Sequence, residues 1–172
     1  DKLFGLHDLP AVLAHLRSDP ALYFKSAEEI EDKARRTLGA ARAALDKTFG
    51  ILPKTECVVQ RIAEAEAPFT TVAYYREPNP DGSRPGAYMI NVSAPTTRPR
   101  YEAQVLAFHE SIPGHHLQIA IAQELPAMPA FRRFFAPTAY TEGWALYVER
   151  VADAHRALES AQTVGKLVLT FA

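Results

Sequence analysis

The sequence predicts a mostly helical α+β fold with a small antiparallel sheet near the middle of the chain. Two observations predict the elements. Apolar residues recur at helical spacing in the first and last thirds, and runs rich in β-branched and aromatic residues lie between them. A third observation excludes a disordered chain, because 48% of the 172 residues are hydrophobic and only 23% are charged.

The first region, residues 1–50, is expected to hold two helices. Asp8 stands two residues before Pro10, so a capping residue precedes a proline in the first turn of a short helix. Ser26 and Glu29 have the spacing of a capping box, in which each side chain binds the other residue's backbone N–H. The long helix that this box opens should end near Gly50.

The second region, residues 51–99, is expected to form the sheet. Residues 57–62, 70–75 and 87–92 are the predicted strands, because they are rich in β-branched and aromatic side chains. Residues 78–86 contain several prolines and glycines, so the second and third strands form a candidate hairpin.

The third region, residues 100–172, is expected to be helical. Pro113 and Gly114 interrupt its first helical stretch, residues 131–135 form a short aromatic segment, and a last helix runs from about Thr141 to Leu158. The three regions are assigned to one partial domain, 1–172. The chain begins without Met and ends in an apolar stretch, so we expect a piece of a larger protein.

Composition narrows the function classes. Nineteen Lys and Arg against twenty Asp and Glu lack the basic surplus of a dedicated nucleic-acid-binding protein. The single cysteine, Cys57, excludes an intramolecular disulfide and is expected to be a buried small hydrophobe. No run of 18 apolar residues suggests a membrane span, and neither a Gly-rich phosphate loop nor a Gly-x-Ser-x-Gly motif is present.

Three histidines and a glutamate lie within eight residues: His109, Glu110, His115 and His116. Such groups are costly to bury unless they are satisfied, and a metal ion satisfies several at once. His-Glu at the end of an apolar helix is similar to the zinc-peptidase motif His-Glu-x-x-His, but Pro113 stands where the second histidine belongs. In an unbroken helix His116 would lie about 10.5 Å along the axis from His109, too far to share an ion.

A bulge at Pro113 and Gly114 resolves this spacing. Proline disrupts the helix and glycine tolerates unusual dihedral angles, so looping out the two residues restores the peptidase spacing between His109 and His115. We therefore favour His115 over His116 as the second ligand. The third ligand of a His₂ site is commonly a carboxylate, and Glu142, 27 residues after His115, is the best candidate. The alternative is that Glu142 only favours the dipole of its own helix.

The runs 108–118 and 142–147 resemble the bacterial domain of unknown function 885 family. Residues 81–86 and the strand that follows them also resemble that family. The family in turn resembles gluzincin-type zinc metallopeptidases, which implies zincin-like helices that carry the metal motif beside the sheet. Family members are several times longer than this chain. Beyond Leu158 the sequence fits the usual continuation poorly, and helices that would complete the cleft are missing.

The resemblance implies a mechanism of peptide-bond hydrolysis. Zn²⁺ would be held by His109, His115 and Glu142, with Glu110 as the general base. Donors for the oxyanion would come from a further set of candidates, each of which has a plain structural alternative. These candidates are His116, Tyr140 and Tyr147.

Further expectations concern partners and competing functions. The strand at 88–92 is a candidate to bind an extended peptide at a sheet edge, with an ordinary sheet strand as the alternative. Phe131, Phe134 and Phe135 are expected to lack cover, so that the chain self-associates. Two other functions stay open: a zinc amidase with a non-peptide substrate, and a metal-binding module without turnover. Mn²⁺, Co²⁺ or Fe²⁺ would also accept these ligands.

Overall fold

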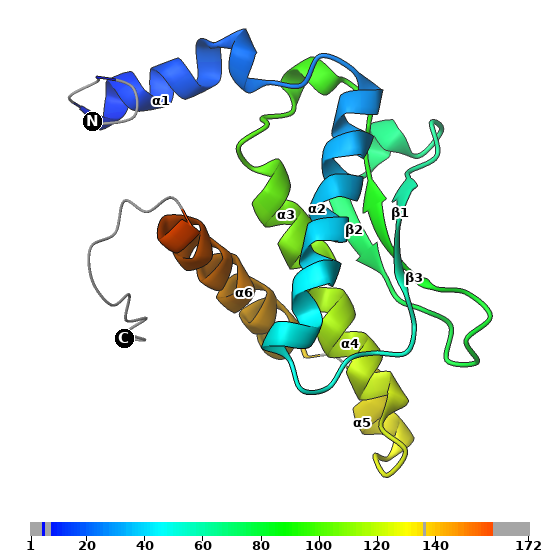
Figure 1. The fold of residues 1–172 in the computed structure, drawn as a ribbon. Coiled ribbons are helices and arrows are strands. Elements are labelled where there is room, and N and C mark those ends of the chain that lie inside the picture. Colours follow the sequence, from blue (N-terminus) through cyan, green and yellow to red (C-terminus); the bar gives the residue numbers. More distant parts are fainter. Residues whose placement is uncertain (1–4, 6–7, 136, 160–172) are drawn as a thin grey trace.

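The computed structural model describes residue 5, residues 8–135 and residues 137–159, and the expected apolar terminal stretch lies outside them (Figure 1). The helices and strands follow the predicted order. The α-helices are α1 (Leu9–Ser18), α2 (Ala27–Thr48), α3 (Ala103–Glu110), α4 (His115–Glu124), α5 (Ala130–Phe134) and α6 (Thr138–Glu159). The strands are β1 (Cys57–Arg61), β2 (Ala73–Arg76) and β3 (Gly86–Ile90). The α+β class is therefore confirmed.

The sheet differs from the prediction because it is mixed rather than antiparallel. Its strand order is β1-β3-β2, with β2 and β3 antiparallel, as the hairpin prediction required. β1 pairs with β3 in parallel, from Cys57 opposite Gly86 to Arg61 opposite Ile90. This arrangement puts β3 in the centre, and all five of its residues are buried. Of the two alternatives for the strand at 88–92, the structure supports the ordinary sheet strand and not the peptide-binding edge, since β3 has a neighbour on each side.

The main core lies where α2 and α3 pack on the sheet (Figure 1). The predicted apolar face of α2 supplies Ala34, Leu38 and Leu45, each less than 9% exposed. Burial of a leucine side chain contributes roughly 1.5–3 kcal/mol, so this face holds the long helix against the strands. Cys57 is buried here as expected, and burial raises the pKa of its thiol to about 12.

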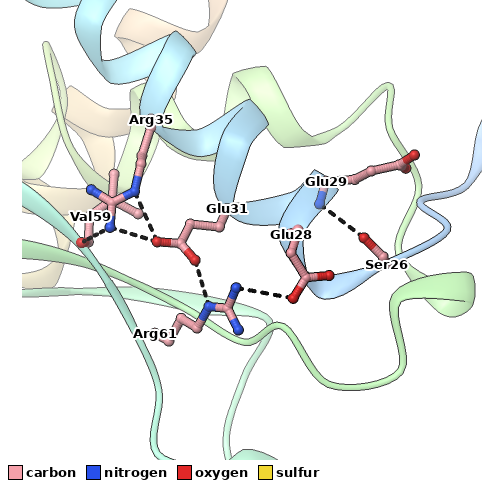
Figure 2. Close-up of polar contacts among 7 residues, drawn as sticks. All are labelled: Ser26, Glu28, Glu29, Glu31, Arg35, Val59 and Arg61. Carbon is pink, nitrogen blue, oxygen red and sulfur yellow. Dashed lines mark hydrogen bonds and ion pairs between the residues drawn. The ribbon is translucent and has the colours of Figure 1, made fainter.

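Charged side chains join the start of α2 to the end of β1 (Figure 2). Glu31 accepts hydrogen bonds from Arg35 Nε at 2.9 Å and from Arg61 Nε at 2.6 Å, and Arg61 also pairs with Glu28. At the cap, Ser26 Oγ accepts from the N–H of Glu29 as predicted. The reciprocal bond of the capping box differs, because the Glu29 carboxylate accepts from the N–H of Lys25.

Two parts of the surface are less covered. In Figure 1, α1 projects away from the sheet, and none of its residues is buried. On α5 and just after it, Phe131 and Phe135 are each 70% exposed and Phe134 is 48% exposed, as the sequence led us to expect.

None of the described helices combines the length and apolar character that crossing a membrane requires.

Candidate metal centre

The predicted interruption of the helix is a four-residue turn between α3 and α4 rather than a two-residue bulge. The N–H of Gly114 donates to the carbonyl of Phe108 at 2.9 Å, and the N–H of His116 donates to the carbonyl of Ser111 at 3.0 Å. A Cβ at position 114 would lie 1.9 Å from the carbonyl oxygen of His109. Only glycine therefore lets α4 start directly against the end of α3, which brings His115 beside His109.

The structure brings together His109, His115 and Glu142. One donor atom from each lies within 4.8 Å of the other two, and this is the group among the described residues that fits a metal ion. His109 Nε2 is 3.3 Å from Glu142 Oε2, and His115 Nε2 is 3.6 Å from Glu142 Oε1. Ligands at about 2.0–2.2 Å from a tetrahedral Zn²⁺ lie roughly 3–3.5 Å apart, so the donor set fits the ion and these two distances are close to that spacing.

Glu110 lies beside this group, with its side chain 14% exposed. Its Oε2 is 3.9 Å from His115 Nε2. Burial raises the pKa of the Glu110 carboxyl, and the charges of Glu142 and Glu149 act in the same direction. His109 and the backbone N–H of Tyr75 oppose that rise. Burial lowers the pKa of His115, which favours the neutral imidazole that a metal ion needs.

Glu149 also reaches the site, although it is not among the predicted site residues. Its Oε1 is 2.5 Å from Nδ1 of His109, on the side of the ring opposite Glu142. The signal that could have found it is its position seven residues after Glu142, since two helical turns return a residue to nearly the same face. Glu142 and Glu149 therefore contact the two nitrogens of one imidazole.

His116 lies outside the group formed by His109, His115 and Glu142, which we call the metal group. Its Nε2 is 2.9 Å from the carbonyl oxygen of Thr55, and its Nδ1 is 2.9 Å from the hydroxyl of Tyr75. A carbonyl only accepts, so Nε2 carries the hydrogen and the tyrosine hydroxyl donates to Nδ1. Burial lowers the pKa of His116 to about 4 and keeps the ring neutral. Both nitrogens are thus engaged by the protein and neither is directed at the metal group.

Tyr140 and Tyr147 also lie away from the group. They sit about 160° and 140° around the axis of α6 from Glu142. Together with Trp144 they line a different cavity, of about 580 Å³, on the other side of this helix. The structure therefore brings none of the predicted oxyanion donors, His116, Tyr140 and Tyr147, to the metal group. Residues that are close in the sequence of one helix face different directions.

A cavity of about 430 Å³ opens over the metal group. Residues from β2 and the segments beside it form one wall, and α3, α4 and α6 form the other. The lining residues that bear on the chemistry are Tyr75, Glu77, His109, Glu110, His115 and Glu142. The lining contains three carboxylates and no Lys or Arg among the described residues, so it is suited to a positively charged ion.

These features define an α+β protein with a candidate His₂Glu metal centre beside a small sheet. The chain belongs to the family described as bacterial protein of unknown function (DUF885), which matches residues 1–168. The predicted family is thereby confirmed, while kinship to zinc metallopeptidases stays a prediction. No curated protein matches the sequence.

A solved structure is similar to this chain. It is described as "the putative lipoprotein from Colwellia psychrerythraea", with 28% sequence identity and a TM-score of 0.83. The match covers 92% of this chain and 28% of the other. The chain therefore spans little more than a quarter of that protein's length.

Proposed function

We propose that the protein is a metal-dependent hydrolase of peptide bonds, with Zn²⁺ as its ion. One observation carries the proposal: His109, His115 and Glu142 converge within 4.8 Å, and Glu110 lies directly beside them. Two imidazoles and one carboxylate are the ligand set of a catalytic rather than a purely structural zinc site, because a coordination position remains open.

The ion, when bound, supplies Lewis acidity that makes water nucleophilic near neutral pH and polarises a carbonyl group. Glu110 has the position and environment of a general base. Its largely buried carboxylate would accept the proton of the attacking water and return it to the leaving amine. Burial raises its pKa towards the working range, which suits both steps.

The free edge of β2 supports a peptide as the substrate. The N–H of Asn91 donates to the carbonyl of Val72, so alternate residues of this strand face β3 and the backbone of Ala73 and Tyr75 faces outward. The backbone N–H of Tyr75 on this edge lies close enough to Glu110 to lower the pKa of its carboxyl. An extended peptide that pairs with this edge would pass beside the general base.

A second candidate function is metal binding without turnover. It is favoured by one observation, namely that His116, Tyr140 and Tyr147 do not face the cavity. Without a donor for the oxyanion the cavity would hold an ion but stabilise the transition state poorly.

Substitution of Glu110 by Gln separates the two candidates. It preserves size and polarity but removes the base. In the longest native polypeptide that contains these residues, we expect unchanged zinc content and a kcat for peptide hydrolysis lowered by about 10²–10⁴-fold. Zinc content and peptide cleavage are the measurements. Zinc-loaded wild-type protein that cleaves no peptide would favour the second candidate, and near-normal turnover by Glu110→Gln would exclude this mechanism.

A further inference from the structure

His109 is held between two carboxylates of a single helix. Its Nε2 is 3.3 Å from Glu142 Oε2, and its Nδ1 is 2.5 Å from Glu149 Oε1. We propose that Glu149 is a positioning residue, which fixes the tautomer and the ring orientation of His109 so that Nε2 binds the metal ion. This inference rests on the metal centre of the proposed function but not on turnover.

The tautomer follows from the chemistry of the contact. An ionised carboxylate has acceptor oxygens and no hydrogen to donate, so Nδ1 of a neutral His109 must carry the hydrogen and donate it to Glu149. The lone pair of the neutral ring is then on Nε2, the nitrogen that faces Glu142. The opposite tautomer would place a hydrogen where the ion has to bind.

The helix that carries both carboxylates is itself held in place. Trp144 Nε1 donates to the carbonyl of Pro113 at 2.8 Å, which ties α6 to the turn between the histidines. Ala145 and Val148 of the same helix are 0% and 2% exposed. Because these contacts fix the position of α6, they also hold the carboxylate of Glu149 towards His109. Its side chain is 26% exposed.

His115 shows what the site is like without such a partner. Its Nδ1 is buried and has no hydrogen-bond partner among the described residues. Glu149 therefore supports one of the two histidines, and no contact of His115 duplicates that support. Partners of this kind contribute about 10–100-fold to metal affinity.

The test measures the affinity of the protein for Zn²⁺ by competition with a chelator, and the absorption spectrum of the Co²⁺-loaded protein. Glu149→Ala should weaken Zn²⁺ binding by about 10–100-fold and shift the Co²⁺ bands, because His109 rotates or changes tautomer. Glu149→Gln keeps an oxygen that can accept from Nδ1. It should therefore restore much of the affinity lost in Glu149→Ala and bring the Co²⁺ spectrum back towards that of the wild type.

Glu31→Gln is the matched control. Like Glu149, Glu31 is a carboxylate on a helix, but its hydrogen-bond donors are Arg35 and Arg61 in the network of Figure 2. It should lower the melting temperature slightly and leave both metal readouts unchanged. If Glu149 only anchored α6, Glu149→Ala and Glu149→Gln would behave like this control. Wild-type Zn²⁺ affinity and Co²⁺ spectra in Glu149→Ala, or in Glu149→Leu where Glu149→Ala does not fold, would overturn the inference, because neither side chain can accept from Nδ1 of His109.

Failure of the proposed function gives a different result. Wild-type protein that binds Zn²⁺ but cleaves no peptide excludes the hydrolase and leaves the role of Glu149 standing. Wild-type protein that binds no Zn²⁺ overturns both.

Discussion

His115 and His116 are adjacent in the sequence and lie in two different environments. His115 directs Nε2 towards Glu142 and has a buried Nδ1 without a partner among the described residues. His116 has both nitrogens engaged, by the carbonyl of Thr55 and the hydroxyl of Tyr75. One side of α4 thus leaves Nε2 of His115 available to a ligand, while the other side engages both ring nitrogens of His116 within the protein.

This difference shows how polar burial separates a site from a core. A buried polar group costs about 1–3 kcal/mol when nothing satisfies it, so a nitrogen such as Nε2 of His115 is retained where a ligand or water can supply the partner. Two histidines at the start of one helix face directions about 100° apart. The same sequence signal therefore yields one candidate metal ligand and one structural residue.

The largest expected effect separates these two histidines directly. His115→Ala should abolish stoichiometric Zn²⁺ binding, whereas His116→Ala should retain most of it. The effect on stability should run the other way. His116→Ala leaves the Thr55 carbonyl and the Tyr75 hydroxyl without their partner, at a cost of about 2–3 kcal/mol in the free energy of unfolding.

Zinc content by elemental analysis and urea unfolding of the metal-free protein check both halves of this prediction. His109→Ala and Glu142→Ala should match His115→Ala in zinc content. A His116→Ala protein that loses its zinc while His115→Ala keeps it would reverse the assignment of the two residues.

A second prediction concerns the turn that orients His115. A Cβ at Gly114 would lie 1.9 Å from the carbonyl oxygen of His109 and 2.3 Å from that of Phe108. Gly114→Ala must therefore push α4 away from α3. We expect a loss of about 1–3 kcal/mol in stability and at least a tenfold loss in Zn²⁺ affinity, since a misplaced His115 no longer shares the ion.

Gly143→Ala is the control for that variant. Gly143 lies next to Glu142 in α6, and a Cβ there meets nothing within 4 Å. This substitution should keep the Zn²⁺ affinity and raise the stability slightly, because alanine favours a helix over glycine by about 0.5–1 kcal/mol. Equal zinc affinities for Gly114→Ala and Gly143→Ala would show that the turn does not set the position of His115.

Local signals predicted most of the helices and the metal group. The Asp8 and Ser26 caps start helices where expected, and the peptidase spacing restored around Gly114 identified His115. These features depend on residues a few positions apart, so a single sequence contains them. Glu142, the candidate third ligand, could be predicted because the chemistry of a His₂ site calls for a carboxylate.

Non-local contacts account for what could not be predicted. The parallel pairing of β1 with β3 joins strands that are separated in sequence by β2, and no local pattern encodes it. The partners of His116 lie 41 and 61 residues away. Tyr140 and Tyr147 were candidate oxyanion donors, but they lie on the side of α6 away from Glu142. In each case three-dimensional packing decides the role.

The smallest expected effect on metal binding comes from the environment of His116. A Cβ at Gly86 would lie 2.6 Å from His116 Nδ1 and 2.7 Å from the Tyr75 hydroxyl. Gly86→Ala should therefore break the hydrogen bond between the Tyr75 hydroxyl and His116 Nδ1 without contacting a candidate metal ligand. We expect a loss of about 1–3 kcal/mol in stability, measured by urea unfolding, and a Zn²⁺ affinity within a factor of about three of the wild type. A tenfold loss of Zn²⁺ affinity in this variant would mean that Tyr75 and His116 transmit their position to His115, and the two environments would then be one site.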